Sequence, residues 1–334
     1  MTLIQVENLQ KAFTRPVRRP GPLGALRSLL AREFTAVRAV DGVSFEVAAG
    51  EMVGYLGPNG AGKSTTLKML TGILVPTAGR IEVGGLVPHR QRVEHVRRIG
   101  VVFGQRTQLW WDLPTVESFE LLRHVYRIPL ARYRENMRRY SALLELGPFL
   151  DTPVRQLSLG QRMRADLAAA LLHEPTILFL DEPTIGLDVV ARERMRGFLA
   201  ETNREHGLTV ILTTHDLGDI ERLCQRVVLI DHGRVIYDGA LEQLRARFGR
   251  RRTLVVDLAN PDDDPRVPGA ELLRREGPRV WLSFDRATLS AAELIAAVVA
   301  RCPVRDLAVE EPAIEDVVRT IYEGGVGTES VYNS

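Results

Sequence analysis

The sequence predicts an α/β fold with a largely parallel sheet, followed by a small α+β domain. A glycine-rich loop at residues 57–64 connects an apolar strand pattern to the start of a helix. Apolar strand patterns at residues 176–180 and 208–212 are separated by a helical pattern at 191–205, an alternation typical of parallel sheets. The composition changes near residues 249–252, where we expect the second domain to begin.

The composition indicates a globular protein of roughly two domains, with 334 residues, 45% hydrophobic and 26% charged residues, and a net charge of +2. The two cysteines, Cys224 and Cys302, lie far apart without a metal-ligand pattern, so we expect buried thiols in a reducing compartment. The first seven residues lack the pattern of a signal peptide. No apolar run approaches the ~20 residues that span a bilayer, so we expect the chain to act from outside it.

The first strands are expected at residues 4–9 and 43–47. Between them, the insertion at residues 14–38 begins with a segment broken by proline and glycine, and its residues 23–30 have helical spacing. The insertion carries six arginines and one acidic residue. Two interpretations stay open: a basic arm that touches lipid headgroups or a membrane partner, and a solvated surface insertion.

Beyond the glycine-rich loop, helical patterns cover residues 115–146 and 161–173, and Gly147-Pro148 separates them. The other expected elements are strands at 80–83 and 99–103 and a hairpin of strands 227–230 and 234–237 around Asp231-His232-Gly233.

The second domain is expected at residues 250–325, followed by a tail at 326–334. Ser290 and Glu293 form a capping-box pattern that opens an apolar helix. The other elements expected there are strands at 253–258, 279–284 and 304–309 and a helix at 315–322.

The glycine-rich loop matches the phosphate-loop template Gly-x4-Gly-Lys-Ser/Thr. Its glycines let backbone N–H groups turn inward around an anion at a helix N-terminus. Lys63 is expected to reach the β- and γ-phosphates of a nucleotide, and the Ser64 hydroxyl to ligate Mg²⁺. A glycine-rich turn with a solvated lysine is the alternative, and the strand and helix on either side disfavour it. The residues of the motif are Gly57, Pro58, Asn59, Gly60, Ala61, Gly62, Lys63 and Ser64.

Three further features have a use beside a phosphate loop. Asp181 and Glu182 end a buried strand, where Asp181 would hold Mg²⁺ and Glu182 would polarise the attacking water. Ser158 and Gly160 open a helix and make a second phosphate site, which suits two chains that face each other head to tail. His215 follows a buried strand, where it is positioned to contact a γ-phosphate.

Together these residues resemble the ATP-binding subunit of ABC transporters over about residues 3–245. The resemblance implies a mixed sheet flanked by helices within a domain of residues 1–247, with a helical subdomain at about 106–175. It implies a Walker A motif that continues to Thr65, a Walker B aspartate at Asp181 and a catalytic glutamate at Glu182.

The resemblance also implies roles for residues outside the Walker motifs. Gln105 would be the Q-loop glutamine that contacts Mg²⁺ or water, and His215 the switch histidine. The D-loop would contain Asp188. In the signature Leu-Ser-Gly-Gly-Gln, Leu159 replaces the first glycine, whereas Ser158, Gly160 and Gln161 are kept.

The aromatic residue that stacks on adenine has two candidates. Phe13 fits by its place at the end of the first strand, and Phe34 fits by its distance from the second. Each residue alone also fits a place in the hydrophobic core.

A closer resemblance is to the ATPase subunits of ABC-2-type exporters, including drug and viologen efflux systems. It rests on the run Trp110-Trp111-Asp112-Leu113-Pro114, the basic insertion and the C-terminal domain near residues 311–316. The two tryptophans either dock a permease helix or belong to the core of the helical subdomain.

The resemblance implies ATP and Mg²⁺ as ligands and a head-to-tail homodimer as the working unit. It further implies a separate membrane permease, reached through Trp110, Trp111 and the insertion, and a cytoplasmic location on the inner face of the cell membrane, with no nucleic acid. The main alternative is a soluble ABC-type ATPase that acts on ribosomes or DNA. Such proteins usually carry two cassettes or a long coiled coil, and this chain has neither pattern. A small-molecule kinase would leave Ser158, Gly160 and His215 unexplained.

Overall fold

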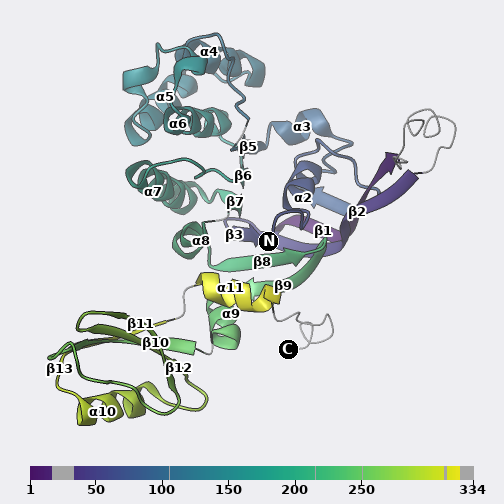
Figure 1. Ribbon diagram of the computed structural model, residues 1–334. Coiled ribbons are helices and arrows are strands. Elements are labelled where there is room, and N and C mark those ends of the chain that lie inside the picture. The colour runs from purple at the N-terminus through teal and green to yellow at the C-terminus, as the bar shows by residue number, and fades with distance from the viewer. Residues whose placement is uncertain (17–33, 105, 215, 250, 312–313, 324–334) are drawn as a thin grey trace, which may run out of the picture. The chain divides into compact units, whose positions relative to one another are not determined.

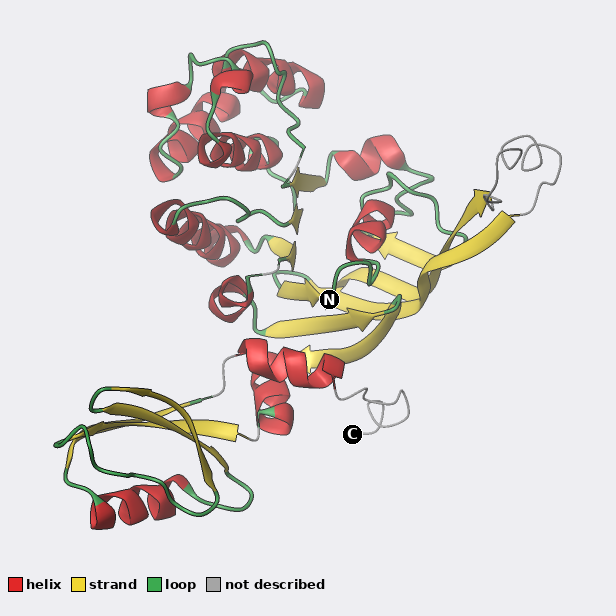
Figure 2. Cartoon of the chain, in the orientation of Figure 1, coloured by secondary structure: helices red, strands yellow, loops and turns green. Residues whose placement is uncertain are grey.

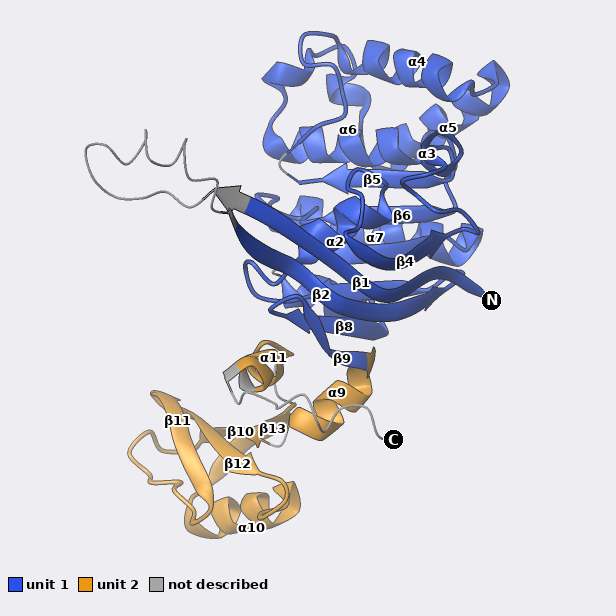
Figure 3. Cartoon of the chain, turned by 90° about the vertical axis from the view of Figure 1, so that its right-hand side faces the viewer, with its two compact units in different colours: residues 1–238 blue, residues 239–334 orange. Residues whose placement is uncertain are grey.

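The computed structural model describes residues 1–16, 34–104, 106–214, 216–249, 251–311 and 314–323. The chain divides into two compact units, residues 1–238 and 239–334 (Figure 3). From the sequence, residues 239–247 are expected in the first domain. In the structure they belong to the second unit, where α9 (Leu241–Phe248) packs against α11 (Ile314–Glu323).

A six-stranded sheet forms the centre of the first unit (Figure 1). The first five strands in the sheet order run parallel, and their apolar residues are almost completely buried. The expected hairpin is present, since the strands at 226–231 and 234–240 are neighbours in this sheet. His232 and Gly233 between them both have positive φ angles (46° and 78°), which suit a two-residue turn. The strand order is β5 (Ile99–Phe103), β6 (Ile177–Asp181), β7 (Thr209–Thr213), β3 (Met52–Leu56), β8 (Arg226–Asp231) and β9 (Arg234–Ala240).

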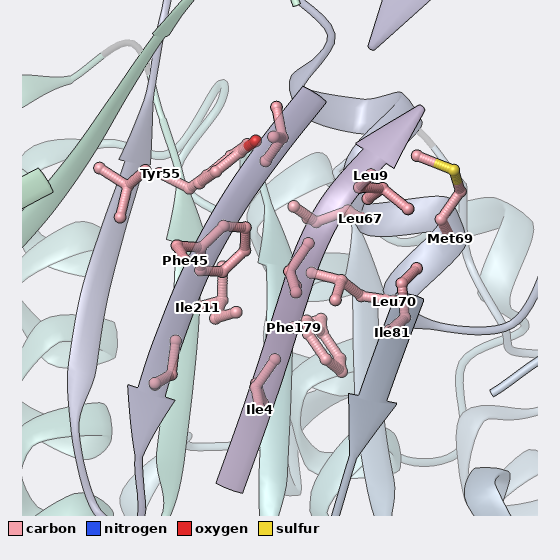
Figure 4. Packing of buried hydrophobic residues seen from close by; sticks show 14 of the residues in the cluster. Ile4, Leu9, Phe45, Tyr55, Leu67, Met69, Leu70, Ile81, Phe179 and Ile211 are labelled. Carbon is pink, nitrogen blue, oxygen red and sulfur yellow. The ribbon is translucent and has the colours of Figure 1, made fainter. Parts of the chain in front are cut away.

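A three-stranded antiparallel sheet packs against the first sheet, with α2 (Lys63–Leu70) in the same core (Figure 4). Tyr55 of β3 contacts Phe45 with ring centroids 5.5 Å apart. The strand order is β2 (Phe34–Ala48), β1 (Thr2–Pro16) and β4 (Ala78–Val83). Strands β1 and β2 span 15 residues each and are longer than predicted, because their pairing continues into the expected insertion, whose residues 14–16 and 34–38 are strand. Residues 17–33 of the insertion lie outside the described residues.

The expected helical run at 115–146 consists of two helices, α4 (Thr115–Tyr126) and α5 (Leu130–Leu143). They separate where Arg127 adopts a left-handed conformation (φ 58°) and Pro129 follows. Asn136 and Tyr140 of α5 donate hydrogen bonds to the last carbonyls of the next helix, α6 (Leu159–Leu171). The other helices described in the first unit are α3 (Arg92–Val96), α7 (Val189–His206) and α8 (Leu217–Leu223), with 3-10 turns at Gly147–Phe149 and Val154–Gln156 (Figure 2).

The second unit is a four-stranded antiparallel sheet with α10 (Ala291–Arg301) against one face. The capping box predicted at Ser290 and Glu293 is present and starts this helix. The strand order is β11 (Ala270–Glu276), β12 (Arg279–Asp285), β10 (Arg251–Leu258) and β13 (Val304–Glu310). The sequence analysis missed β11, because its largely exposed and charged residues show no apolar alternation.

Both cysteines are buried, at 4% (Cys224) and 3% (Cys302) exposed, as expected. Within the part of the chain that the structure describes, no helix is long and apolar enough to cross a membrane.

Candidate nucleotide-binding site

The loop at residues 57–64 passes so close to neighbouring strands that only glycine fits at two positions. A Cβ on Gly57 would lie 2.4 Å from the carbonyl oxygen of Ile230, and one on Gly62 would lie 2.4 Å from that of Ala39. Gly62 also has a φ of 105° and is the N-cap of α2. The glycines therefore seat the loop against β2 and β8 with the first amides of α2 available to an anion.

Lys63 is buried at the start of α2, only 8% exposed. Its Nζ atom donates hydrogen bonds to the carbonyl oxygens of Gly57 and Pro58, the second at 3.1 Å. Burial lowers the pKa of Lys63, and the carboxylates of Glu182 and Asp181 oppose this effect. An ammonium group at this position would bring positive charge to a bound phosphate.

Asp181 ends β6 at the carboxyl edge of the parallel strands, level with Thr213 of β7. Its Oδ1 atom accepts hydrogen bonds from Thr213 Oγ1 at 2.6 Å and from Ser64 Oγ at 3.4 Å. A carboxylate beside a serine hydroxyl is an oxygen donor set that suits Mg²⁺ together with nucleotide phosphates. The described residues contain no cluster of three acidic, histidine or cysteine ligands, and such a phosphate-assisted site needs none.

Glu182 follows Asp181 with a left-handed backbone (φ 56°), which is uncommon for a residue other than glycine. Its N–H donates to the carbonyl of Thr213 at 2.9 Å. A Cβ on Gly104 would lie 2.4 Å from the Glu182 carbonyl oxygen, so the end of β5 also holds this backbone. The strand ends therefore fix the direction in which Glu182 leaves β6.

A cavity of about 750 Å³ brings Lys63, Ser64, Asp181 and Glu182 together, within the size range of small-molecule sites. Of the predicted loop residues, Pro58, Asn59, Gly60, Gly62 and Thr65 also line this cavity, whereas Gly57 and Ala61 support the loop from behind. Sequence reasoning missed several lining residues, because no local motif marks them: Val37, Arg38, Ala39, Lys68, Ile73, Phe103, Gly104, Arg106 and Ile185.

Phe13 lines the same cavity with 38% of its surface exposed, and the Lys11 ammonium lies 5.3 Å from its ring centroid. Its partial exposure disagrees with a place in the core. The side chain of Phe34 lies outside the described residues, as do Gln105 and His215.

Asp219 is a buried residue near these strand ends that sequence reasoning missed, with 0% of its surface exposed. It accepts hydrogen bonds from Thr184 (2.6 Å), in the loop after β6, and from Thr214 (3.3 Å), which follows β7. It also pairs with Arg196 of α7. Asp219 therefore ties together two loops that leave the carboxyl edge of the sheet.

Ser158 is the N-cap of α6, in a capping box with Gln161. A Cβ on Gly186 would lie 2.2 Å from Leu159 Cδ2, so Leu159 covers Gly186 in the loop before α7. Asp188 caps α7 by accepting from the N–H of Ala191 at 2.8 Å. The described residues that line the cavity include none of Ser158, Gly160, Gln161 and Asp188. The cavity at the phosphate loop is therefore formed without these four residues.

Trp110 and Trp111 are 42% and 51% exposed, which disagrees with the alternative that placed them in the core of the helical subdomain. The Arg162 guanidinium lies 5.9 Å from the Trp111 ring centroid, and Asp112 forms a 2.9 Å ion pair with Arg155. Two adjacent exposed tryptophans on an anchored segment form a surface suited to a protein partner.

Residues 40–185 match the family model described as ABC transporter. The Nod factor export ATP-binding protein I of Ralstonia nicotianae is 39% identical over 238 residues, which are 67% of this chain and 71% of that protein. The daunorubicin resistance ATP-binding protein DrrA3 of Streptomyces coeruleorubidus is 36% identical over 301 residues, which are 88% of this chain and 86% of that protein.

The solved dimeric structure of the cassette MJ0796 in a post-hydrolysis state, bound to ADP and Pi, has the same fold. It superposes with a TM-score of 0.59 at 26% identity, over 71% of this chain and 98% of that one.

Proposed function

This chain belongs to the ABC transporter family of ATP-binding proteins, and from that membership we propose that it hydrolyses ATP to power an exporter whose permease is a separate chain. The cavity that joins Lys63, Ser64, Asp181 and Glu182 carries this proposal, because it supplies a phosphate clamp, a metal site and a carboxylate for water. The names of the two relatives, one for export and one for drug resistance, support the exporter class.

The proposed working unit is a head-to-tail dimer with two nucleotides between the chains. Ser158 and Gly160 do not line the cavity of their own chain. In a head-to-tail pair they would instead reach the nucleotide that the partner holds, through the α6 N-terminus. The dimeric cassette with ADP and Pi supports this arrangement.

Ser64 and Asp181, together with Gln105, would hold Mg²⁺, which neutralises phosphate charge when bound. Lys63 would stabilise the negative charge that develops on the phosphate in the transition state. Glu182 would orient or deprotonate the attacking water, and His215 would contact the γ-phosphate. Phe13, which lines the cavity near Lys11, is the better placed of the two candidates to stack on adenine.

The permease would contact Trp110 and Trp111, whose exposure on an anchored segment supports a docking role. The insertion at residues 14–38 is a second proposed contact. The chain would then sit on the inner face of the cell membrane through its partner. ATP closes the dimer, hydrolysis opens it, and this motion would pass through the segment of Trp110 to the permease.

The test of the ATPase site is Glu182→Gln, which preserves the shape of the side chain. The variant should bind ATP and form a dimer that survives size-exclusion chromatography, while its turnover falls by about a hundredfold or more. ATP binding by equilibrium dialysis and phosphate release measure the two parts separately. Hydrolysis at the wild-type rate would show that Glu182 does not act on the water.

The test of the exporter class is a mild-detergent pull-down of the tagged protein from its own cells. A polytopic membrane protein in stoichiometric amount is the expected companion. Recovery of ribosomal or DNA-bound factors without a membrane chain would favour the soluble ATPase instead, and would leave the nucleotide-site assignments intact.

A further inference from the structure

Asp166 is a buried carboxylate on α6 that no motif marks, with 4% of its surface exposed. Its Oδ1 atom accepts hydrogen bonds from Thr107 Oγ1 at 2.8 Å and from the Gln108 N–H at 3.1 Å. The Gln108 side-chain amide donates in return to the Asp166 carbonyl at 3.1 Å. Because a buried carboxylate is costly unless hydrogen bonds satisfy it, these contacts attach the segment at residues 107–108 firmly to α6.

The segment continues to Asp112, and two more contacts attach it: one to α6 a helical turn before Asp166, and one to the residues just before α6. Arg162 lies over the Trp111 ring, four residues before Asp166 on the same helix face. The Arg155 N–H donates to the Trp111 carbonyl at 3.0 Å, and its guanidinium pairs with Asp112. The signature residues 157–161 thus lie between two points that are fixed to residues 107–112.

We propose that Asp166 is a positioning residue that holds the signature, Ser158 and Gly160, in register with the segment of Trp110 and Trp111. Breaking its hydrogen bonds would leave the phosphate loop of the same chain intact and would misplace the signature that serves the partner's nucleotide. This inference rests on the proposed head-to-tail dimer. In that dimer, Asp166 would connect the proposed docking surface, Trp110 and Trp111, to Ser158 and Gly160, the residues that contact the partner's nucleotide.

The experiment measures ATP-dependent dimerisation of the full chain in the Glu182→Gln background, where ATP persists. Asp166→Ala removes the acceptor and should raise the dimer dissociation constant about tenfold or more, while ATP affinity changes by less than about twofold. Asp166→Asn keeps an oxygen acceptor and should dimerise nearly as well as the background. Analytical ultracentrifugation and equilibrium ATP binding give the two numbers.

Thr107 provides a matched pair at the other end of the contact. Thr107→Val keeps the shape and removes the hydroxyl, which donates to Asp166 and also accepts from the Leu109 N–H at 3.1 Å. It should weaken dimerisation in the same direction as Asp166→Ala. Thr107→Ser keeps the hydroxyl and should not. A purely structural role would instead lower ATP binding and thermal stability together with dimerisation, in all variants that disturb the packing.

Each outcome decides one question. Asp166→Ala chains that dimerise as well as the background overturn the positioning role, as do chains that lose ATP binding. The positioning role is supported if Asp166→Ala and Thr107→Val dimerise weakly but bind ATP normally, while Asp166→Asn dimerises nearly as well as the background. If the Glu182→Gln background itself fails to dimerise with ATP, the proposed head-to-tail function is refuted instead.

Discussion

Glu182 shows how single residues set the geometry of the site. Its left-handed backbone is held on one side by the Thr213 carbonyl and on the other by Gly104, where a Cβ would lie 2.4 Å from the Glu182 carbonyl oxygen. The site tolerates this conformation because both neighbouring strands hold it in place. A displacement at Gly104 should therefore move the Glu182 carboxylate, which we propose orients or deprotonates the attacking water.

Gly104→Ala should lower the ATP turnover number by about tenfold or more with little change in ATP affinity, because displacement of a positioned group is costly. Steady-state hydrolysis measures the turnover number, and equilibrium ATP binding measures the affinity. Gly197→Ala is the matched control, since a Cβ there meets nothing within 4 Å, and its activity should stay unchanged. Wild-type turnover in Gly104→Ala would show that the end of β5 adjusts without moving Glu182.

His173 makes stability depend on pH. Its ring stacks on that of Tyr126 with ring centroids 3.9 Å apart, and its Nε2 atom donates a hydrogen bond to the Ile99 carbonyl oxygen at 3.0 Å. Burial lowers the pKa of His173 to about 4. Between about pH 6.5 and pH 4, His173 is protonated in the unfolded chain but not in the folded chain. The free energy of unfolding therefore falls as the pH falls through this range.

Wild-type protein should therefore lose about 3 kcal/mol more than His173→Gln between pH 7 and pH 4. Denaturant unfolding of both proteins at several pH values measures the difference. An equal loss of unfolding free energy in the two proteins would mean that the protonation of His173 does not differ between the folded and unfolded chains in this pH range.

The sequence revealed the residues whose function depends on near neighbours in the chain, such as Lys63, Ser64 and the Asp181–Glu182 pair. It did not reveal Asp166 or Asp219, because their partners lie far away in sequence. The position of Trp111 was also undecidable from composition, since a tryptophan suits a core and an interface equally well. Its exposure depends on how the 107–113 segment is anchored.

At the scale of elements, the buried strands were the most predictable. The interiors of β6 (residues 177–180) and β7 (residues 210–212) are apolar and buried, as is typical of parallel strands whose two faces are both covered. Elements that depend on tertiary contacts were missed: α3, α8 and α9 are short, and β11 has mostly exposed residues. The division between α4 and α5 depends on the conformation of Arg127, which a helical periodicity does not encode.

The capping box of α10 is a test of element stability away from the nucleotide site. Ser290 Oγ accepts from the Glu293 N–H at 3.2 Å, and the Glu293 carboxylate accepts from the Ser290 N–H at 2.8 Å. Ser290→Ala should destabilise the second unit by about 1 kcal/mol, whereas Ser290→Asp should keep most of the cap. Chemical unfolding followed by fluorescence reports on this unit when Trp110 and Trp111 are both replaced by Phe, because Trp281 of β12 is then the remaining tryptophan. An unchanged midpoint for Ser290→Ala would show that the cap contributes nothing there.

At the scale of the whole molecule, the two units have separate hydrophobic cores. The first core joins α2 to both sheets of residues 1–238, and the second joins α10 to the sheet of β10 to β13. Among the residues that the structure describes, those that line the proposed nucleotide cavity all belong to the first unit. A ligand that binds only the folded first unit should stabilise that unit and leave the second unaffected.

Calorimetry of Glu182→Gln should therefore show two unfolding transitions, of which MgATP shifts only one. At a concentration about a hundred times the dissociation constant, ATP adds about 2.7 kcal/mol, which corresponds to about 5 °C or more for a unit of this size. The Ser290→Ala change identifies the other transition, because it should lower that one alone. Lys63→Ala serves as the control that abolishes the ATP shift. A single transition that moves as a whole would mean that the two cores unfold cooperatively, so that ATP binding in the first unit also stabilises the second.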